Sequence, residues 1–334
     1  MENGYVKLKK LLDDPTISEI MINGPSKVFA EKSGVKVPTD VVFANEQEVL
    51  ELVDKIFALR GKRVDKDIPY SDVCLEDGTR INAIISPLSR FGVSVTFRKF
   101  SKSIKTGEDL VRLGAMDQQA LNYLIDCIKT KKNIIISGGT GVGKTTVLQA
   151  LSRFFTPDER VITIEDAAEL RLEQPNVVSL ETRPKDRDGK GEVTLRDLIA
   201  NALRMTPDRL IIGEVRGAEA IDMIQAMATG HSGTLGILHG NSPREVIGRL
   251  ETMILLSGIA LPLPDIRRLI ASTIEVIVHL QRMDGTRKVT SISTIDCIRQ
   301  GEIVLKDIFG YAFSHKDANG KDVYALKPLV ALMS

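Results

Sequence analysis

Short apolar runs alternate with helical patterns through the middle of the chain. In the helical segments, apolar residues recur at the three- to four-residue spacing of one helix face. Buried strands separated by helices are typical of a parallel sheet with crossover connections. The pattern predicts strands at 133–137, 161–164, 176–181, 210–212 and 234–238, with helices at 146–151, 195–203 and 218–228.

The pattern changes near both ends of the chain. After Pro264 it predicts a helix over 265–271 and two strands joined at Asp284-Gly285, which would form a small antiparallel appendage. The first hundred residues mix helix and strand, and Asp77-Gly78 between alternating segments indicates a hairpin. Expected there are helices at 6–12 and 46–59 and strands at 18–23, 26–31, 70–75, 79–85 and 93–98.

These patterns predict an α/β protein of two domains. An α+β domain over 1–100 would be followed by a polar linker over 101–108 and a larger domain over 109–334. A length of 334 residues allows each domain a core of its own.

Composition narrows the class of protein. Apolar residues make up 43% and charged residues 27%, as in an ordinary globular protein. The net charge of +1 and the absence of tryptophan disfavour a nucleic-acid surface built on basic charge and stacking. The 3 cysteines form no Cys-x-x-Cys pair, so structural zinc is not expected. With no long apolar run and no apolar N-terminal segment, we expect a cytoplasmic protein.

One motif predicts a nucleotide site. The sequence G-x-x-x-x-G-K-[ST], the Walker A pattern, lies between a predicted strand and a predicted helix, where backbone amides and the helix N-terminus can surround a phosphate. A glycine-rich surface loop is the alternative. Lys144 would reach the β- and γ-phosphates of ATP, and the Thr145 hydroxyl would bind Mg²⁺. The proposed cofactor-binding residues are Gly138, Gly139, Thr140, Gly141, Val142, Gly143, Lys144, Thr145 and Thr146.

Acidic residues follow two of the predicted strands. Glu214 follows the apolar run 210–213, as in a Walker B segment, at the strand edge where α/β proteins bind ligands. It could polarise the attacking water, or simply be a solvated acid. The segment 163–169 holds three further acids, of which Glu169 is favoured as a helper of Mg²⁺ or water; a charged turn is the alternative.

Two histidines and two arginines complete the candidate set. His231 and His239 bracket the predicted strand 234–238, where an imidazole could bond to phosphate, although a core histidine is the alternative for each. Arg80 and Arg98 lie on strands of the first domain. An arginine can stabilise charge on a γ-phosphate, but composition alone favours a surface role.

The ordered motifs resemble the secretion and pilus-assembly ATPases of the GspE/PilT/VirB type. Segments outside the ATPase motifs resemble the CpaF-type branch, which serves tight-adherence (Flp) pili. The four family boxes stand in the expected order at 138–146, 164–169, 211–216 and 228–239, and the branch-specific segments are 17–25, 61–65, 75–85, 238–244 and 304–310.

The resemblance implies a homohexameric ring. Each subunit would have a PAS-like N-terminal domain and a RecA-like motor domain, with ATP between them. It also implies roles: Arg80 and Arg98 reach the nucleotide phosphates, Glu169 belongs to the acidic box, Glu214 is catalytic, and His231 and His239 form the histidine box. Related ATPases lie at the cytoplasmic face of the inner membrane and act on platform proteins of a pilus.

Two other functions stay open from the sequence. An ATP-driven nucleic-acid translocase would use the same phosphate loop, but it would need a basic channel that the neutral charge balance does not indicate. A nucleotide-gated scaffold that does not hydrolyse ATP is disfavoured by the presence of both Lys144 and Glu214.

Overall fold

The computed structural model describes residues 3–32, 34–75, 77–99, 106–185, 188–283, 285–316 and 322–330. The chain divides into two compact units, Met1–Ser103 and Ile104–Ser334. Most of the predicted linker, 101–108, lies outside the described residues. Its last two residues are helical instead, because Thr106 and Asp109 form a reciprocal capping box that starts helix α3 at Gly107.

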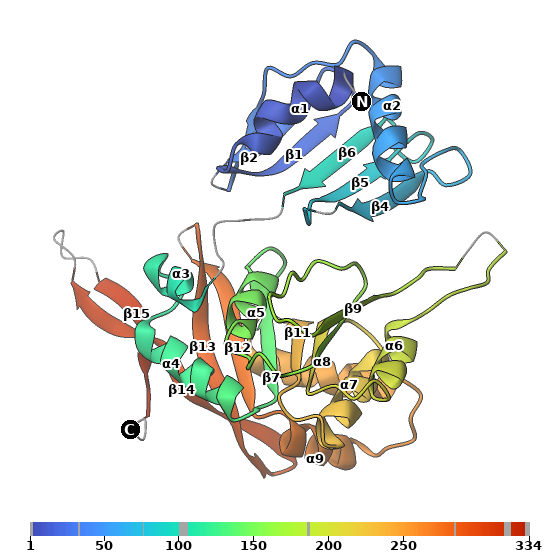
Figure 1. Ribbon diagram of the computed structural model, residues 1–334. Helices are drawn as coiled ribbons and strands as arrows, with labels where there is room; N and C mark the ends of the chain where they lie inside the picture. The colour runs from blue at the N-terminus through green and yellow to red at the C-terminus, as the bar shows by residue number, and fades with distance from the viewer. Residues whose placement is uncertain are drawn as a thin grey trace. The chain divides into compact units, whose positions relative to one another are not determined.

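Unit 1 is an antiparallel sheet with two helices on one face (Figure 1). Ile20 and Ile22 of the sheet and Val53 and Phe57 of the second helix belong to one buried cluster. Successive side chains of a strand point to opposite faces, so the residues that alternate with these buried ones along each strand face away from the helices. The strands, in the order β3-β2-β1-β6-β5-β4, are β1 (Ile17–Asn23), β2 (Val28–Lys32), β3 (Val35–Pro38), β4 (Tyr70–Cys74), β5 (Arg80–Ile84) and β6 (Ser94–Arg98); the helices are α1 (Asn3–Asp13) and α2 (Glu46–Ala58).

Unit 2 is built on one nine-stranded sheet. Its spatial order is β15-β14-β13-β12-β7-β11-β10-β8-β9, and the strands from β12 to β9 run parallel. The strands are β7 (Ile134–Gly138), β8 (Val161–Glu165), β9 (Val177–Glu181), β10 (Arg209–Val215), β11 (Leu235–His239), β12 (Val276–Met283), β13 (Thr286–Arg299), β14 (Glu302–Lys316) and β15 (Asp322–Pro328).

Helices cover both faces of this sheet (Figure 1). Ile134 and Ile136 pack in a cluster with α3, α4 and α5, while Ile135 packs in a second cluster with α6 to α9. The continuous apolar runs of the sequence therefore follow from burial on two sides. The helices are α3 (Gly107–Arg112), α4 (Gln118–Lys129), α5 (Lys144–Ser152), α6 (Leu195–Ala202), α7 (Glu219–Ala228), α8 (Pro243–Leu256) and α9 (Leu263–Thr273).

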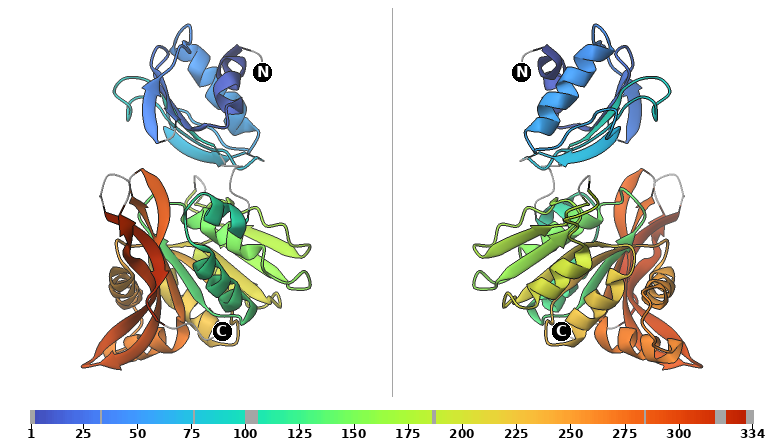
Figure 2. Two further views of the ribbon diagram at one scale, coloured as in Figure 1. Left: turned by 90° about the vertical axis from the view of Figure 1, so that its left-hand side faces the viewer. Right: turned by 90° about the vertical axis from the view of Figure 1, so that its right-hand side faces the viewer.

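The C-terminal strands are larger than the predicted appendage and belong to the main sheet. β12 pairs in parallel with β7, and β13, β14 and β15 continue from it as an antiparallel meander. Figure 2 shows these strands, orange to red, beside the rest of unit 2. The predicted hairpin corresponds to β12 and β13. Its first strand, β12, lies inside the sheet between β13 and β7, and residues 276–280 of this strand are buried. Within the described residues, no helix combines the length and apolarity needed to cross a bilayer.

Candidate active site

The phosphate-loop motif connects β7 to α5 in a shape that requires glycine. Gly138, Gly141 and Gly143 have φ angles of 150°, 72° and 96°, which side-chain-bearing residues rarely adopt. A Cβ atom on Gly138 would also lie 2.4 Å from the carbonyl oxygen of Leu280 on β12. The start of the loop is thus pressed against the neighbouring strand, and this contact fixes where the loop leaves the sheet.

Replacing Gly138 with alanine is expected to lower the free energy of unfolding by about 3 kcal/mol, because a strained φ and a backbone clash would combine. Gly139→Ala is the matched control: the nearest atom to its added Cβ is 3.9 Å away, and its φ is not positive. Urea titration of both variants measures the difference. Equal stability of the two would contradict the packing described here.

The N-terminus of α5 fits an anion. Gly143 caps it without a side-chain hydrogen bond, and no acidic residue lies in its first turn. Its amides and positive dipole end therefore remain for a ligand such as phosphate. Thr145 is half-buried in this first turn. No cluster of three or more His, Cys, Asp or Glu suited to a metal occurs among the described residues. The Thr145 hydroxyl, in the first turn of α5, is of a type that can bind a divalent cation together with phosphate oxygens.

The Lys144 ammonium lies inside the loop. It donates hydrogen bonds to the carbonyl oxygens of Gly138 (3.1 Å) and Gly139 (2.7 Å), and the side chain is only 7% exposed. Burial lowers the pKa of Lys144, and the charge of Glu214 partly opposes that effect. A triphosphate in the loop would offer the ammonium charged acceptors in place of two neutral carbonyls, which is a stronger interaction.

Glu214 lies near the end of β10, beside the phosphate loop. One carboxylate oxygen accepts a hydrogen bond from the Arg216 guanidinium at 2.6 Å, and the other lies 2.5 Å from Nε2 of His239. His239 ends the adjacent strand β11, and its Nδ1 is 3.4 Å from Nζ of Lys144. The structure thus brings Lys144, Glu214 and His239 together at the carboxyl edge of the parallel strands.

Charge keeps Glu214 ionised. Burial raises its pKa, but Arg216, His239 and Lys144 outweigh burial, and the net shift is downward. Burial and the Lys144 charge lower the pKa of His239, which favours a neutral imidazole near neutral pH. An ionised carboxylate beside a cradle for phosphate is suited to orient an attacking water molecule.

The acidic box, residues 164–169, contains a buried carboxyl group, that of Glu165 at the end of β8. Its oxygen accepts hydrogen bonds from the backbone amides of Glu169 and Leu170, each at 3.1 Å. This contact folds the box into a turn that brings the Glu169 and Asp166 charges near Arg216. Gly213 makes room for it, because a Cβ there would lie 2.7 Å from Cγ of Glu165. Glu169 is therefore part of the charged surroundings of Arg216.

Burial raises the pKa of Glu165 to about 7, from an ordinary value of 4.5. The folded protein then holds a proton that the unfolded chain has lost, so stability should fall as pH rises from about 5 to 7. We expect Glu165→Gln to remove that loss. The free energy of unfolding of the variant minus that of wild type should therefore be about 3 kcal/mol larger at pH 8 than at pH 5. Urea unfolding at both pH values measures this, and a difference independent of pH would contradict the raised pKa.

His231 does not join this group within the subunit. It precedes β11, whereas His239 ends it, and a five-residue strand spans roughly 13 Å. His231 lies instead near the amino edge of the sheet, where its carbonyl oxygen accepts a hydrogen bond from Thr234. Its Nδ1 is buried without a hydrogen-bond partner among the described residues. The sequence groups the two histidines because they are eight residues apart, but in the structure strand β11 separates them.

Arg80 and Arg98 of unit 1 lie side by side. They are register partners on β5 and β6, so their side chains leave the same face of that sheet, opposite the face covered by the helices. Glu19 of β1 pairs with Arg98 at 2.8 Å. Two like charges directly opposite each other normally destabilise a sheet. A paired arrangement of arginines on an open face suits recognition of an anion such as phosphate.

Sequence reasoning did not single out His279. It lies in β12 and is 1% exposed, and it hydrogen-bonds to Ser137, the residue before Gly138. The only signal was one histidine inside an otherwise apolar run, which does not distinguish a core residue from a residue that supports the site.

Comparison with known proteins gives one family over most of the chain. Residues 2–305 match the family model described as type II/IV secretion system protein. A Mycobacterium tuberculosis protein, provisionally named for conjugal transfer, is 33% identical over 301 residues, which cover 88% of this chain and 84% of that protein. The type IV secretion system protein VirB11 of Brucella suis is 32% identical over 313 residues, covering 84% and 85% respectively.

Solved structures agree on the fold. The pilus retraction motor PilT, determined with bound ADP, aligns with a TM-score of 0.63 and 18% identity over 99% of this chain and 84% of that one. The ATPase DotB of Legionella pneumophila aligns with a TM-score of 0.59 and 21% identity over 84% and 77%.

Proposed function

Because the chain belongs to the type II/IV secretion system protein family and is an ATP hydrolase, we propose that it is the motor of a pilus or secretion machine. The observation that carries the catalytic part is the convergence of Lys144, Glu214 and His239 at one strand edge. Lys144 and the loop amides bind the phosphates, and Glu214 orients water toward the γ-phosphate. Mg²⁺, bound at Thr145, would neutralise charge on the phosphates.

The machine proposed here is a type IV-like tight-adherence pilus. The support is the set of branch-specific segments found in both units, of which 75–85 is the longest. The motor would act as a homohexamer at the cytoplasmic face of the inner membrane and contact the pilus platform proteins there. Glu169 would help to place Mg²⁺ or water from the acidic box.

Three measurements test this assignment. Light scattering of the purified chain with ATP and Mg²⁺ should give six times the mass of one chain, and phosphate release should stop when EDTA removes the metal. In the host, deletion of the gene should abolish surface pili, and the wild-type gene should restore them where a Glu214→Gln gene does not. Normal piliation in the deletion strain would reject the pilus role.

Arg80 and Arg98 are proposed to stabilise charge on the phosphates during turnover. We expect Arg80→Ala and Arg98→Ala each to lower the ATPase rate about 10-fold or more, since an arginine near a transferring phosphoryl group acts mainly in the transition state. Arg90→Ala is the matched control, because Arg90 is an exposed arginine on the loop between β5 and β6. A double Arg80/Arg98 variant with the wild-type rate would remove both residues from the mechanism.

A nucleic-acid translocase is the second candidate, favoured by the conjugal-transfer name of the Mycobacterium tuberculosis relative. In that case DNA should stimulate phosphate release, and the stimulation should weaken steeply as salt is raised. The pilus proposal predicts no stimulation by DNA at any salt concentration.

A further inference from the structure

His279 connects two strand ends that carry catalytic groups. Its Nε2 lies 3.1 Å from the carbonyl oxygen of Asn241, and its Nδ1 lies 2.9 Å from Oγ of Ser137. A carbonyl oxygen only accepts, so Nε2 carries the proton; in the neutral ring Nδ1 then accepts the hydroxyl proton of Ser137, for which the Val278 carbonyl oxygen at 3.3 Å is the more distant acceptor. The two contacts therefore fix one neutral tautomer, and burial supports it by lowering the pKa of His279.

The two partners of His279 lead directly into the site. Ser137 precedes Gly138, where the phosphate loop begins, and Asn241 lies two residues after His239. Gln281 donates a second hydrogen bond to the Asn241 carbonyl at 3.1 Å. The Asn241 amide and side chain in turn bond to Glu245 in the first turn of α8. The segment that follows His239 is thus fastened to β12 on one side and to α8 on the other.

An apolar residue would have served a purely packing role at this position. Ile277 and Val278 on the same strand are completely buried, and a buried imidazole must have its polar atoms satisfied to avoid a penalty. His279 satisfies both of its nitrogens, and it does so on the two strands that present Lys144 and His239. Backbone pairing of β7 with β11 already sets His239 opposite Gly138, and His279 adds side-chain contacts from a third strand, β12, to Ser137 and to the Asn241 carbonyl oxygen.

We propose that His279 is a positioning residue for ATP hydrolysis, which holds His239 in place against Glu214 and Lys144. The inference rests on the proposed function, because it concerns the same site. His239 lies within 3.4 Å of Lys144 and 2.5 Å of Glu214. Small displacements of a positioned group slow a reaction much more than they weaken binding. His279 therefore acts on turnover through His239.

The test separates turnover from nucleotide binding in the full chain. His279→Ala should lower kcat at least 10-fold, while the Kd for a nonhydrolysable ATP analogue with Mg²⁺ changes less than 3-fold. His279→Gln can still reach the Asn241 carbonyl but not Ser137, and should lower kcat 3- to 10-fold; it also serves if the alanine variant does not fold. A kcat within 2-fold of wild type in both variants would overturn the proposal.

A double-mutant cycle tests the route through His239. In a His239→Ala background, His279→Ala should change kcat less than 2-fold, because the group that it positions is already missing. If the two substitutions lowered kcat independently, so that their fold-losses multiplied in the double variant, the proposal would be overturned. If the wild-type chain released no phosphate at all, the proposed function itself would fail; a normal wild-type rate beside unaffected His279 variants would overturn only this inference.

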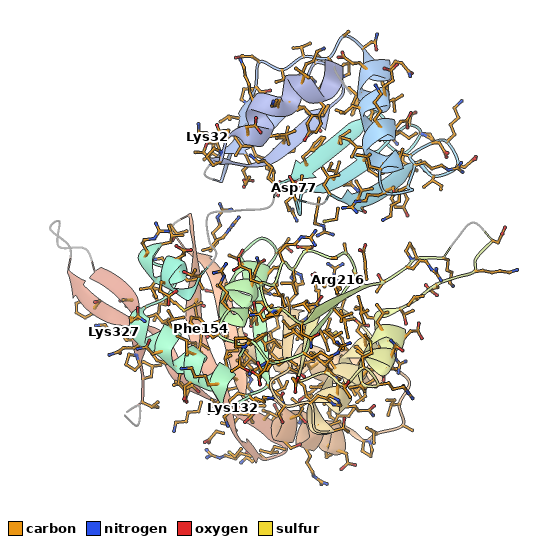
Figure 3. The ribbon with its side chains drawn as sticks, in the orientation of Figure 1. Lys32, Asp77, Lys132, Phe154, Arg216 and Lys327 are labelled. Atoms are coloured by element: carbon orange, nitrogen blue, oxygen red, sulfur yellow. The ribbon has the colours of Figure 1, made fainter. Side chains whose placement is uncertain are left out.

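Asn133 provides the matched control at the other edge of the sheet. It is 5% exposed and joins the same strands: it donates to the Thr273 carbonyl before β12 and accepts from Gly233 and Thr234 before β11. Figure 3 shows the neighbouring Lys132 and the site residue Arg216 at opposite edges of this sheet. Asn133→Ala should lower Tm while kcat, measured well below Tm, stays within 2-fold. An equal loss of kcat in Asn133→Ala would mean that losing any buried polar contact between these strands slows turnover, and it would overturn the positioning role of His279.

Discussion

Glu214→Gln is expected to reduce ATP turnover about 10³-fold while ATP remains bound. The substitution keeps the shape of the side chain but removes the negative charge, so an attacking water molecule loses its charged, basic acceptor. The carboxylate is ionised because Arg216, His239 and Lys144 together outweigh its burial. Affinity should change only a few-fold, because the loop amides and Lys144 still bind the phosphates. Single-turnover phosphate release and titration with a fluorescent ATP analogue measure the two quantities.

Glu181→Gln is the control for this result. Glu181 also ends a strand of the same parallel sheet, as the register partner of Glu165, but it is exposed at the edge strand β9. It should keep the wild-type rate. A Glu214→Gln variant with more than about a tenth of the normal kcat would rule out a direct role for Glu214, since general acid–base groups contribute roughly 10²–10⁴-fold.

Lys144→Ala is expected to weaken ATP binding at least about 100-fold and to abolish measurable hydrolysis. The Lys144 ammonium already points into the loop, where its Nζ lies 2.7 Å from the Gly139 carbonyl oxygen. A hydrogen bond to a charged group contributes about 1.5–3 kcal/mol, so the two that Lys144 would make to the β- and γ-phosphates contribute about 3–6 kcal/mol, and each 1.4 kcal/mol is a factor of ten in affinity. Binding of the fluorescent analogue measures the loss.

The control for Lys144 is another lysine of the same unit. Lys132 forms an ion pair with Glu275 at 2.7 Å, before the amino end of β7. Lys132→Ala should therefore keep normal affinity for ATP. Binding by Lys144→Ala within 3-fold of wild type would mean that the nucleotide does not occupy this loop.

Local patterns in the sequence were enough to predict the centre of the site. The apolar run before Gly138 and the glycines after it set both the strand and the loop, because both depend on adjacent residues. The same holds for Glu214, since an apolar strand that ends in a carboxylate places it at the ligand-binding edge. The family boxes then identified the class of protein, which the comparisons confirm.

What the sequence did not predict depends on contacts between distant residues. His279 lies 142 residues after Ser137 in the sequence, and the parallel pairing of β12 with β7 brings the two residues together as register partners. The opposite placement of His231 and His239 follows from the direction of one strand. The predicted two-strand appendage is part of a longer meander, since β14 pairs with β13 and β15 pairs with β14. The sequence of β14, EIVLKDIFGYAFSHK, lacks a regular alternation of apolar and polar residues, so the pattern did not predict this strand.

A structure with Mg²⁺ and a nonhydrolysable ATP analogue tests the central claim most directly. We predict that the triphosphate lies over residues 138–145, that Nζ of Lys144 has exchanged the Gly139 carbonyl for phosphate oxygens, and that the Glu214 carboxylate faces the γ-phosphate. An analogue bound elsewhere, with Lys144 still bonded to the Gly138 and Gly139 carbonyls, would contradict it.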